Sequence, residues 1–289
     1  MVKEYIKNKS AKFQNDKDLF EILKGTSITF VIKVFGSLVG FLVMILITRG
    51  YGESGQDVFG KYLLGLLVLR IFLLIGKFGA DTALLRFVSG FNALNLLGNA
   101  RKVYRKAILH ILPIGIILSA VMYFSASFFS EQFGVPKHYV ECLAFLILPY
   151  SWFFVNTQSL RGLKDIVSFA FFFNTSVTLF AGIVLATLFV LNKDLFLSNP
   201  TWPIYAFSIG IVISFICSLI LWNKKSKGEG FAAEQEVSNK SFLNVAIPLM
   251  LAQSVSFIMG WTDQLMLGKM MTTADVGIYG VAFKFSTLS

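Results

Sequence analysis

The chain has 289 residues, of which 55% are hydrophobic and 15% are charged, and its mean hydropathy is +0.70. This balance lies well outside the range of soluble globular domains and indicates a membrane protein. The net charge of +10 comes from basic residues dispersed over several short segments, which argues against a nucleic-acid partner.

Seven apolar blocks in the sequence are each about 20 residues long, which is the length a helix needs to cross about 30 Å of hydrocarbon. An eighth block begins near Ile278 and is too short to cross before Ser289. The sequence therefore predicts an all-α, polytopic membrane protein that is an N-terminal fragment cut inside a span. The predicted spans are 28–48, 61–79, 105–125, 139–157, 167–190, 203–222 and 242–260.

Lys and Arg residues gather on one side of these spans. Segments 1–27, 80–104, 158–166 and 223–241, together with Arg105 and Lys106 at the edge of the third span, hold 17 of the 26 Lys and Arg residues. The segments on the other side hold five. Because short cytoplasmic segments carry the excess of positive charge, we predict a multi-pass protein of the cytoplasmic (inner) membrane with its N-terminus in the cytoplasm.

The chain divides into four segments. Residues 1–24 are polar and Lys-rich, and they predict either an amphipathic helix on the inner leaflet or a disordered tail. Residues 25–222 form a first lobe of six spans, and the Lys-, Gly- and Glu-rich residues 223–241 form a cytoplasmic linker. Residues 242–289 begin a second, truncated lobe.

The start of the second lobe resembles the start of the first. Asp57-Val-Phe-Gly-Lys-Tyr62 and Asp275-Val-Gly-Ile-Tyr279 both follow an apolar span and a short loop, and both open the next span. Six spans precede the linker, so both lobes begin on the same side of the membrane. That pattern indicates a parallel repeat about an axis along the membrane normal, as in transporters with two equivalent halves.

Several motifs together resemble those of polysaccharide repeat-unit (Wzx-type) flippases of the multidrug/oligosaccharidyl-lipid/polysaccharide (MOP) exporter superfamily. The resemblance covers about residues 20–289. The motifs are Leu23-Lys-Gly-Thr-Ser-Ile-Thr-Phe30, Leu46-Ile-Thr-Arg-Gly-Tyr-Gly52 with Val58-Phe-Gly-Lys-Tyr62, Phe78-Gly-Ala-Asp-Thr-Ala-Leu-Leu-Arg-Phe-Val88, Ser159-Leu-Arg-Gly-Leu-Lys164 and Thr262-Asp-Gln-Leu-Met-Leu-Gly268.

This resemblance implies two six-helix lobes around a V-shaped cavity that opens alternately to either side of the membrane. It implies movement of an undecaprenyl-pyrophosphate-linked glycan from the inner to the outer leaflet, among membrane lipids and beside polysaccharide polymerase machinery. The sequence holds no nucleotide-binding, zinc-protease or serine-hydrolase motif, so we expect no enzymatic activity, no cofactor and no metal.

Two alternatives are a multidrug or toxin cation antiporter of the same superfamily and a membrane-embedded glycan-modifying enzyme. A cation exporter needs acidic groups within the spans of its first lobe, but the carboxylates of this lobe lie at span ends. An enzyme would be expected to place catalytic groups in a large outer loop, but the outer loops here are about a dozen residues each. The flippase interpretation is therefore preferred.

Arg70 lies near the middle of the second span, about 14 Å from either end. A charge at that depth costs at least about 2.5–3.5 kcal/mol, so it should face a protein interior or a wet cavity. Its guanidinium suits a pyrophosphate group, although a structural partner on a neighbouring helix would also explain it. Lys33 in the first span and Lys284 in the second lobe are further candidates for this cationic cavity.

Three other residues are candidates for gating or for ion coupling. Asp81 lies four residues after Lys77, and the pair is either a local helix-end ion pair or, with Arg86, a latch between the two lobes. Asp263 follows the seventh span at its outer end, where it is either a coupling-ion ligand or a solvated loop carboxylate.

Overall fold

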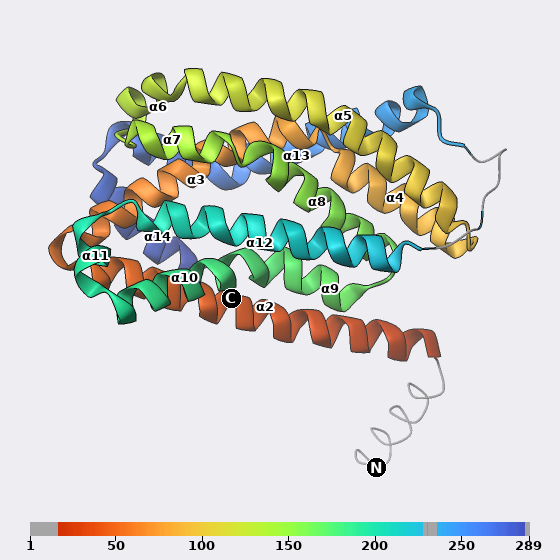
Figure 1. The fold of residues 1–289 in the computed structure, drawn as a ribbon, viewed down its shortest axis with the longest axis horizontal. Helices are drawn as coiled ribbons and strands as arrows, with labels where there is room; N and C mark the ends of the chain where they lie inside the picture. The colour runs from red at the N-terminus through yellow and green to blue at the C-terminus, as the bar shows by residue number, and fades with distance from the viewer. Residues whose placement is uncertain (1–16, 228–229, 231–235, 287–289) are drawn as a thin grey trace, which may run out of the picture.

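The computed structural model describes residues 17–227, 230 and 236–286, and for residues 17–24 it describes the backbone alone. All its regular elements are helical within this part of the chain, and Figure 1 shows them as a long bundle. The elements are α2 (Lys17–Gly50), η1 (Gly52–Ser54), α3 (Gly55–Lys77), α4 (Ala80–Ala93), α5 (Leu97–Phe124), α6 (Ala126–Phe133), α7 (Lys137–Ala144), α8 (Ile147–Gly162), α9 (Ile166–Phe171), η2 (Phe172–Ser176, a π-helical turn), α10 (Val177–Leu191), α11 (Lys193–Ser198), α12 (Trp202–Lys225), α13 (Asn239–Met270) and α14 (Thr273–Ser286).

The predicted spans are confirmed as helices. In the described residues six helices are long and apolar enough to cross a membrane, and a seventh span forms if α7 and α8 are counted together. The chain is thus an all-α, multi-pass membrane protein. The predicted N-terminal segment 1–24 lies outside the described residues as far as residue 16, and from Lys17 onward it is continuous with α2.

The fourth span is bent by 50° between α7 and α8. The break falls at Phe145 and Leu146, four and three residues before Pro149. A proline ring clashes with the carbonyl four residues earlier, which here belongs to Phe145, so the sequence itself explains where this helix bends.

The second span ends in a sharp break. Phe78 and Gly79 both have left-handed backbone conformations, with φ of 37° and 75°, and α4 begins at Ala80. The predicted second span continued to residue 79, whereas α3 ends at Lys77. The break places Asp81 at the first turn of α4, facing the same neighbours as the end of α3.

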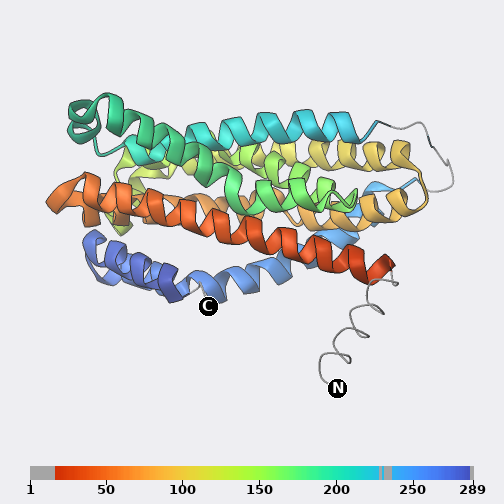
Figure 2. The same ribbon diagram turned by 90° about the horizontal axis from the view of Figure 1, so that it is seen from below.

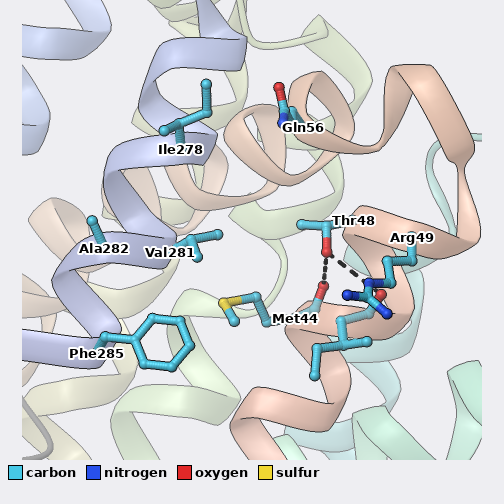
Figure 3. A pocket seen from close by; sticks show the side chains of 9 residues that line it. Met44, Thr48, Arg49, Gln56, Ile278, Val281, Ala282 and Phe285 are labelled. Atoms are coloured by element: carbon cyan, nitrogen blue, oxygen red, sulfur yellow. Dashed lines mark hydrogen bonds between the residues drawn. The ribbon is translucent and has the colours of Figure 1, made fainter.

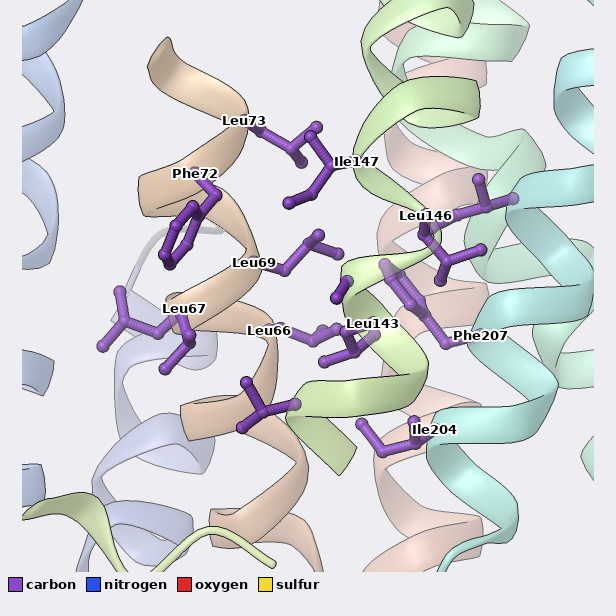
Figure 4. Packing of buried hydrophobic residues seen from close by; sticks show 14 of the residues in the cluster. Leu66, Leu67, Leu69, Phe72, Leu73, Leu143, Leu146, Ile147, Ile204 and Phe207 are labelled. Atoms are coloured by element: carbon purple, nitrogen blue, oxygen red, sulfur yellow. The ribbon is translucent and has the colours of Figure 1, made fainter. Parts of the chain in front are cut away.

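We keep the name first lobe for helices α2 to α12 and second lobe for α13 and α14. The core of the first lobe lies along α3. Its leucines interdigitate with side chains of α7, α8 and α12, as Figure 4 shows for Leu66, Leu69, Leu143 and Phe207. Leu64, Leu67 and Leu69 are each 1% exposed. Helix α3 is therefore the central element of the bundle, and it carries Arg70 on the side that remains open to the second lobe.

Helices α13 and α14 lie together along one face of the first lobe (Figure 2). Both pack against α3. We call the end of the bundle that carries the 223–241 segment the linker end, and the opposite end the α11 end (Figure 1).

Candidate functional site

A cavity of about 250 Å³ lies between α3 of the first lobe and α13 and α14 of the second. We call it the central cavity. Helices α2, α10 and α12 complete its wall. Its polar and aromatic lining consists of Tyr62, Arg70, Thr178, Trp261, Gln264 and Lys284, together with phenylalanines. The structure thus brings two of the predicted cavity residues, Arg70 and Lys284, into one cavity.

Arg70 reaches across to the second lobe. Its guanidinium carbon lies 4.0 Å from the centre of the Trp261 ring. Within the described residues, this stacking is the contact made by its charged group, and Arg70 takes part in no hydrogen bond or ion pair there. A stacked guanidinium keeps its N–H donors in the plane of the group, where they remain available to an anion.

Lys284 reaches in the opposite direction, from the second lobe to the first. Its ammonium lies 5.4 Å from the ring centre of Phe41, next to Gly40, where an added Cβ would overlap it. The two lobes therefore make reciprocal contacts through basic side chains. The second helix of each lobe extends a basic side chain to an aromatic ring on the first helix of the other.

The lining of the central cavity contains no Asp or Glu among the described residues. With two basic side chains and no carboxylate, this cavity attracts an anion and repels a cation. Lys33 is not part of the lining and its side chain is exposed. It lies seven residues before Gly40, which places it on the same side of α2 and about 10 Å nearer the linker end.

Asp81 joins a network between the two lobes at the linker end. Its carboxylate accepts a hydrogen bond from Lys77 Nζ at 2.9 Å, and the two side chains are only 4% and 15% exposed. Gln253 on α13 donates to Thr82 Oγ1 at 2.7 Å and to Asp81 at 3.4 Å, and it accepts from Lys77 at 3.4 Å. Lys77 and Asp81 thus form the local ion pair, and this pair also contacts the second lobe through Gln253. A role as a latch stays a prediction.

Arg86 takes no part in this network. It is exposed on α4, and its side chain makes no hydrogen bond or ion pair in the described part of the chain.

Asp263 lies within a helix and not in a loop, because α13 continues to Met270, well past the predicted end of this span at residue 260. Its exposed carboxylate accepts a hydrogen bond from the Tyr279 hydroxyl at 2.9 Å. This contact joins α13 to α14 inside the second lobe, so the geometry gives Asp263 no partner in the first lobe.

At the α11 end, α3 and α14 cross with their backbones in contact. A Cβ atom at Gly60 would overlap the carbonyl oxygen of Thr273, and one at Gly277 would overlap that of Gln56. The contact is reciprocal, because Gln56 and Thr273, and likewise Gly60 and Gly277, are each separated by 217 residues. Small residues at such a crossing let helices approach closely, as they do in membrane helix pairs generally.

A polar cluster borders this crossing. Asp57 accepts a hydrogen bond from Thr273 Oγ1 of the second lobe and pairs with Lys61 at 2.5 Å. In the sequence, Asp57 served only to align the repeat, and Gln264 stood within the Thr262–Gly268 motif without a role of its own. Gln253 and Trp261 were missed, because one Gln or Trp in an apolar helix has no motif around it.

A second cavity, of about 510 Å³, lies between α2 and α14 at the α11 end (Figure 3). Met44, Ile278 and Phe285 make it largely apolar, while Arg49 and Gln56 supply polar groups. Met44 lines both cavities, so they adjoin one another along α2.

Ion pairs at the linker end tie the helix ends together. Burial opposes ionisation of Asp165, but hydrogen bonds from Lys225, at 2.5 Å, and from Ser168 outweigh it and hold the pKa of this carboxyl below its usual value. Lys102 pairs with Glu236 at 2.9 Å, and this hydrogen bond lowers the pKa of Glu236. No group of three or more His, Cys, Asp or Glu side chains suited to a metal ion occurs in the described ranges.

The fold and cavity define a class of protein. It is a helical membrane protein in which two helices of a second lobe pack against the first lobe, with a cationic cavity between them. Two solved structures share this fold. One is a MOP superfamily transporter from Pyrococcus furiosus Vc1 (DSM3638), described as having a binding pocket of reverse polarity that suggests a different function. It has 14% identity and a TM-score of 0.56, covering 93% of this chain and 59% of its own.

The second structure is described as protein A. It has 16% identity and a TM-score of 0.57, over 91% of this chain and 60% of its own. The chain therefore spans about three fifths of the length of the solved structures it matches. Among curated proteins, none matches the sequence significantly. The model of the polysaccharide biosynthesis protein family matches residues 22–289, and the chain belongs to this family.

Proposed function

We propose that this chain is part of a transporter that moves a polyprenyl-pyrophosphate-linked oligosaccharide from the inner to the outer leaflet of the cytoplasmic membrane. Such a substrate carries its charge on the pyrophosphate. That charge must cross about 30 Å of hydrocarbon, where an unpaired ion is strongly disfavoured. Fixed cations midway offset part of this cost.

The observation that carries the proposal is that the charge of Arg70 has no acidic partner among the described residues. Arg70 lies within the second membrane-spanning helix and lines the central cavity. An interior Arg normally has an acidic partner. Here Trp261 stabilises the cation without occupying its donors, which leaves the guanidinium free to bind phosphate oxygens in pairs.

The other basic residues extend this path. Lys284 brings a second positive charge to the central cavity from the opposite lobe. Lys33, on α2, lies nearer the end we predict to be cytoplasmic, where a pyrophosphate would enter. The alternative of a cation antiporter lacks support from this lining, because two cations without a carboxylate disfavour a cationic drug.

Substitutions at Arg70 test the proposal in the full protein, expressed in a flippase-deficient strain that it complements. Arg70→Ala should abolish export of surface polysaccharide with the protein still present in the membrane. Arg70→Lys should restore export only in part, because the charge remains while the paired donor geometry is lost.

Arg105→Ala is the matched control, since Arg105 is exposed on α5 and lies outside the central cavity. It should export normally. Polysaccharide is measured on the cell surface and protein by immunoblot of membranes. Full export by a normally expressed Arg70→Ala protein would refute the proposal.

A further inference from the structure

Gln264 is the one residue of the central cavity lining, among those described, whose amide oxygen is buried without a partner. The side chain is 4% exposed, and its Oε1 accepts no hydrogen bond from any described residue. A buried acceptor left unpaired destabilises the folded protein, because it has given up its hydrogen bonds to water. Such a group in a binding cavity marks a place where a ligand supplies the missing donor.

The position of Gln264 relative to Arg70 limits what that ligand is. Gln264 follows Trp261 by three residues, so the two side chains lie on the same face of α13, with Cβ atoms about 5–6 Å apart. Trp261 in turn is covered by the guanidinium of Arg70. A group bound to Arg70 therefore has Gln264 within the length of one small chemical group.

An ionised pyrophosphate offers only acceptors, so it cannot satisfy the oxygen of Gln264. The group attached to the pyrophosphate can. In a glycan it is a sugar ring, which carries hydroxyl and, in many sugars, acetamido donors.

We propose that Gln264 forms a subsite for the first sugar of the substrate, accepting a hydrogen bond from a hydroxyl or amide N–H next to the pyrophosphate that Arg70 holds. This inference rests on the proposed function. It adds a division of labour: Arg70 binds the charge common to all such lipids, and Gln264 distinguishes a sugar-bearing lipid from the bare carrier.

Binding of two probes to the full protein in lipid nanodiscs tests this division. One probe is polyprenyl pyrophosphate, and the other is the same lipid carrying a single N-acetylhexosamine. The wild-type protein should bind the sugar-bearing probe about tenfold more tightly, as expected when a buried polar group gains its partner. In Gln264→Met, which keeps the shape of the side chain, this ratio should fall to about one while affinity for the bare probe stays within about twofold.

Gln158→Met is the matched control. Gln158 on α8 is also buried with an unpaired amide oxygen, but it lies outside the central cavity. It should keep the wild-type ratio. Arg70→Ala should weaken the binding of both probes and leave the ratio of their affinities unchanged as well.

The outcomes separate the two proposals. If Gln264→Met weakens the binding of both probes equally, the inference is overturned, since Gln264 would then contact the phosphates or only pack against its neighbours. An unchanged ratio in this variant would overturn it too. If the wild type binds the bare probe with no gain from the sugar, the subsite is wrong and the proposed function stands. If the wild type binds neither probe, the proposed function itself fails.

Discussion

Arg70 and Trp261 stack on one another across the boundary between the two lobes, with 4.0 Å between the guanidinium carbon and the ring centre. They lie 191 positions apart in the sequence, on α3 and α13. The contact does two things at once. It stabilises a charge inside a membrane-spanning helix, and it joins the lobes at the point where we propose that the substrate binds.

Trp261 should therefore matter through its ring. Trp261→Phe keeps an aromatic face and should keep most of the export activity. Trp261→Ala removes a contact worth about 0.5–2 kcal/mol and should lower export several-fold. Surface polysaccharide in the complemented strain, normalised to membrane protein, measures both. Equal activity of the Phe and Ala variants would show that the aromatic ring contributes nothing.

The crossing of α3 and α14 should resist even the smallest added side chain. Asp57→Cys and Thr273→Cys replace two hydrogen-bonded residues and should cross-link rapidly on oxidation. Gly60→Ala, added to this pair, should slow cross-linking strongly, because its Cβ meets the Thr273 backbone and forces the helices apart. Gly90→Ala is the control, since a Cβ at Gly90 meets no atom within 4 Å. Rapid cross-linking in the Gly60→Ala protein would contradict the described contact.

The network at the linker end should show strong coupling between Lys77 and Asp81. Asp81→Asn leaves a buried ammonium uncompensated and should cost about 3–5 kcal/mol of unfolding free energy. Lys77→Met combined with Asp81→Asn should recover much of that loss, because the unpaired charge is gone. Gln253→Leu should cost less than Asp81→Asn, since the ion pair survives. Thermal unfolding in detergent gives the ranking, and additive single effects would exclude a coupled pair.

The orientation can be tested with single cysteines in a Cys142→Ala/Cys217→Ala background. Both Ser198 and Lys227 are exposed. Ser198 ends α11, shortly before α12 begins, and Lys227 lies just after the other end of α12. If the N-terminus is cytoplasmic, a membrane-impermeant reagent added to intact cells should label Ser198→Cys and leave Lys227→Cys unlabelled. The reverse labelling pattern would overturn the predicted topology.

The Asp165–Lys225 pair predicts a pH dependence of stability. The folded pKa of Asp165 lies below the value of about 3.9 expected in an unfolded chain. Its stabilising effect is therefore complete above about pH 4 and is lost as the pH falls through the folded pKa. Lys225→Met should lower the free energy of unfolding slightly at pH 7, by less than about 1 kcal/mol for this partly exposed pair.

That difference from the wild type should shrink as the pH falls and vanish below the folded pKa of Asp165, where the carboxyl is protonated in both proteins. Thermal unfolding in detergent over a series of pH values from 7 downward measures it. A difference that stays constant with pH would show that Lys225 acts through packing.

The sequence alone determined the helices and their membrane spans. About 20 consecutive apolar residues have few alternatives to a membrane-crossing helix, and Pro149 located the bend of the fourth span, because both effects are local. The sequence also predicted that Arg70 faces a protein interior, since lipid exposure at that depth is too costly. The same count of spans also predicted which connecting segments lie at the linker end of the bundle and which lie at the α11 end.

Only the tertiary structure decided which residues share a site. It brought Lys284 to the central cavity and left Lys33 at an exposed position on the same side of α2. It extended α13 past Asp263, and it gave Asp81 its partner Gln253 from 172 residues away. Only the structure showed that Trp261 and Gln264 line the central cavity. A membrane span fixes the depth of a side chain, but the rotation of the helix about its own axis is set by its neighbours, and that rotation selects the residues that line the cavity.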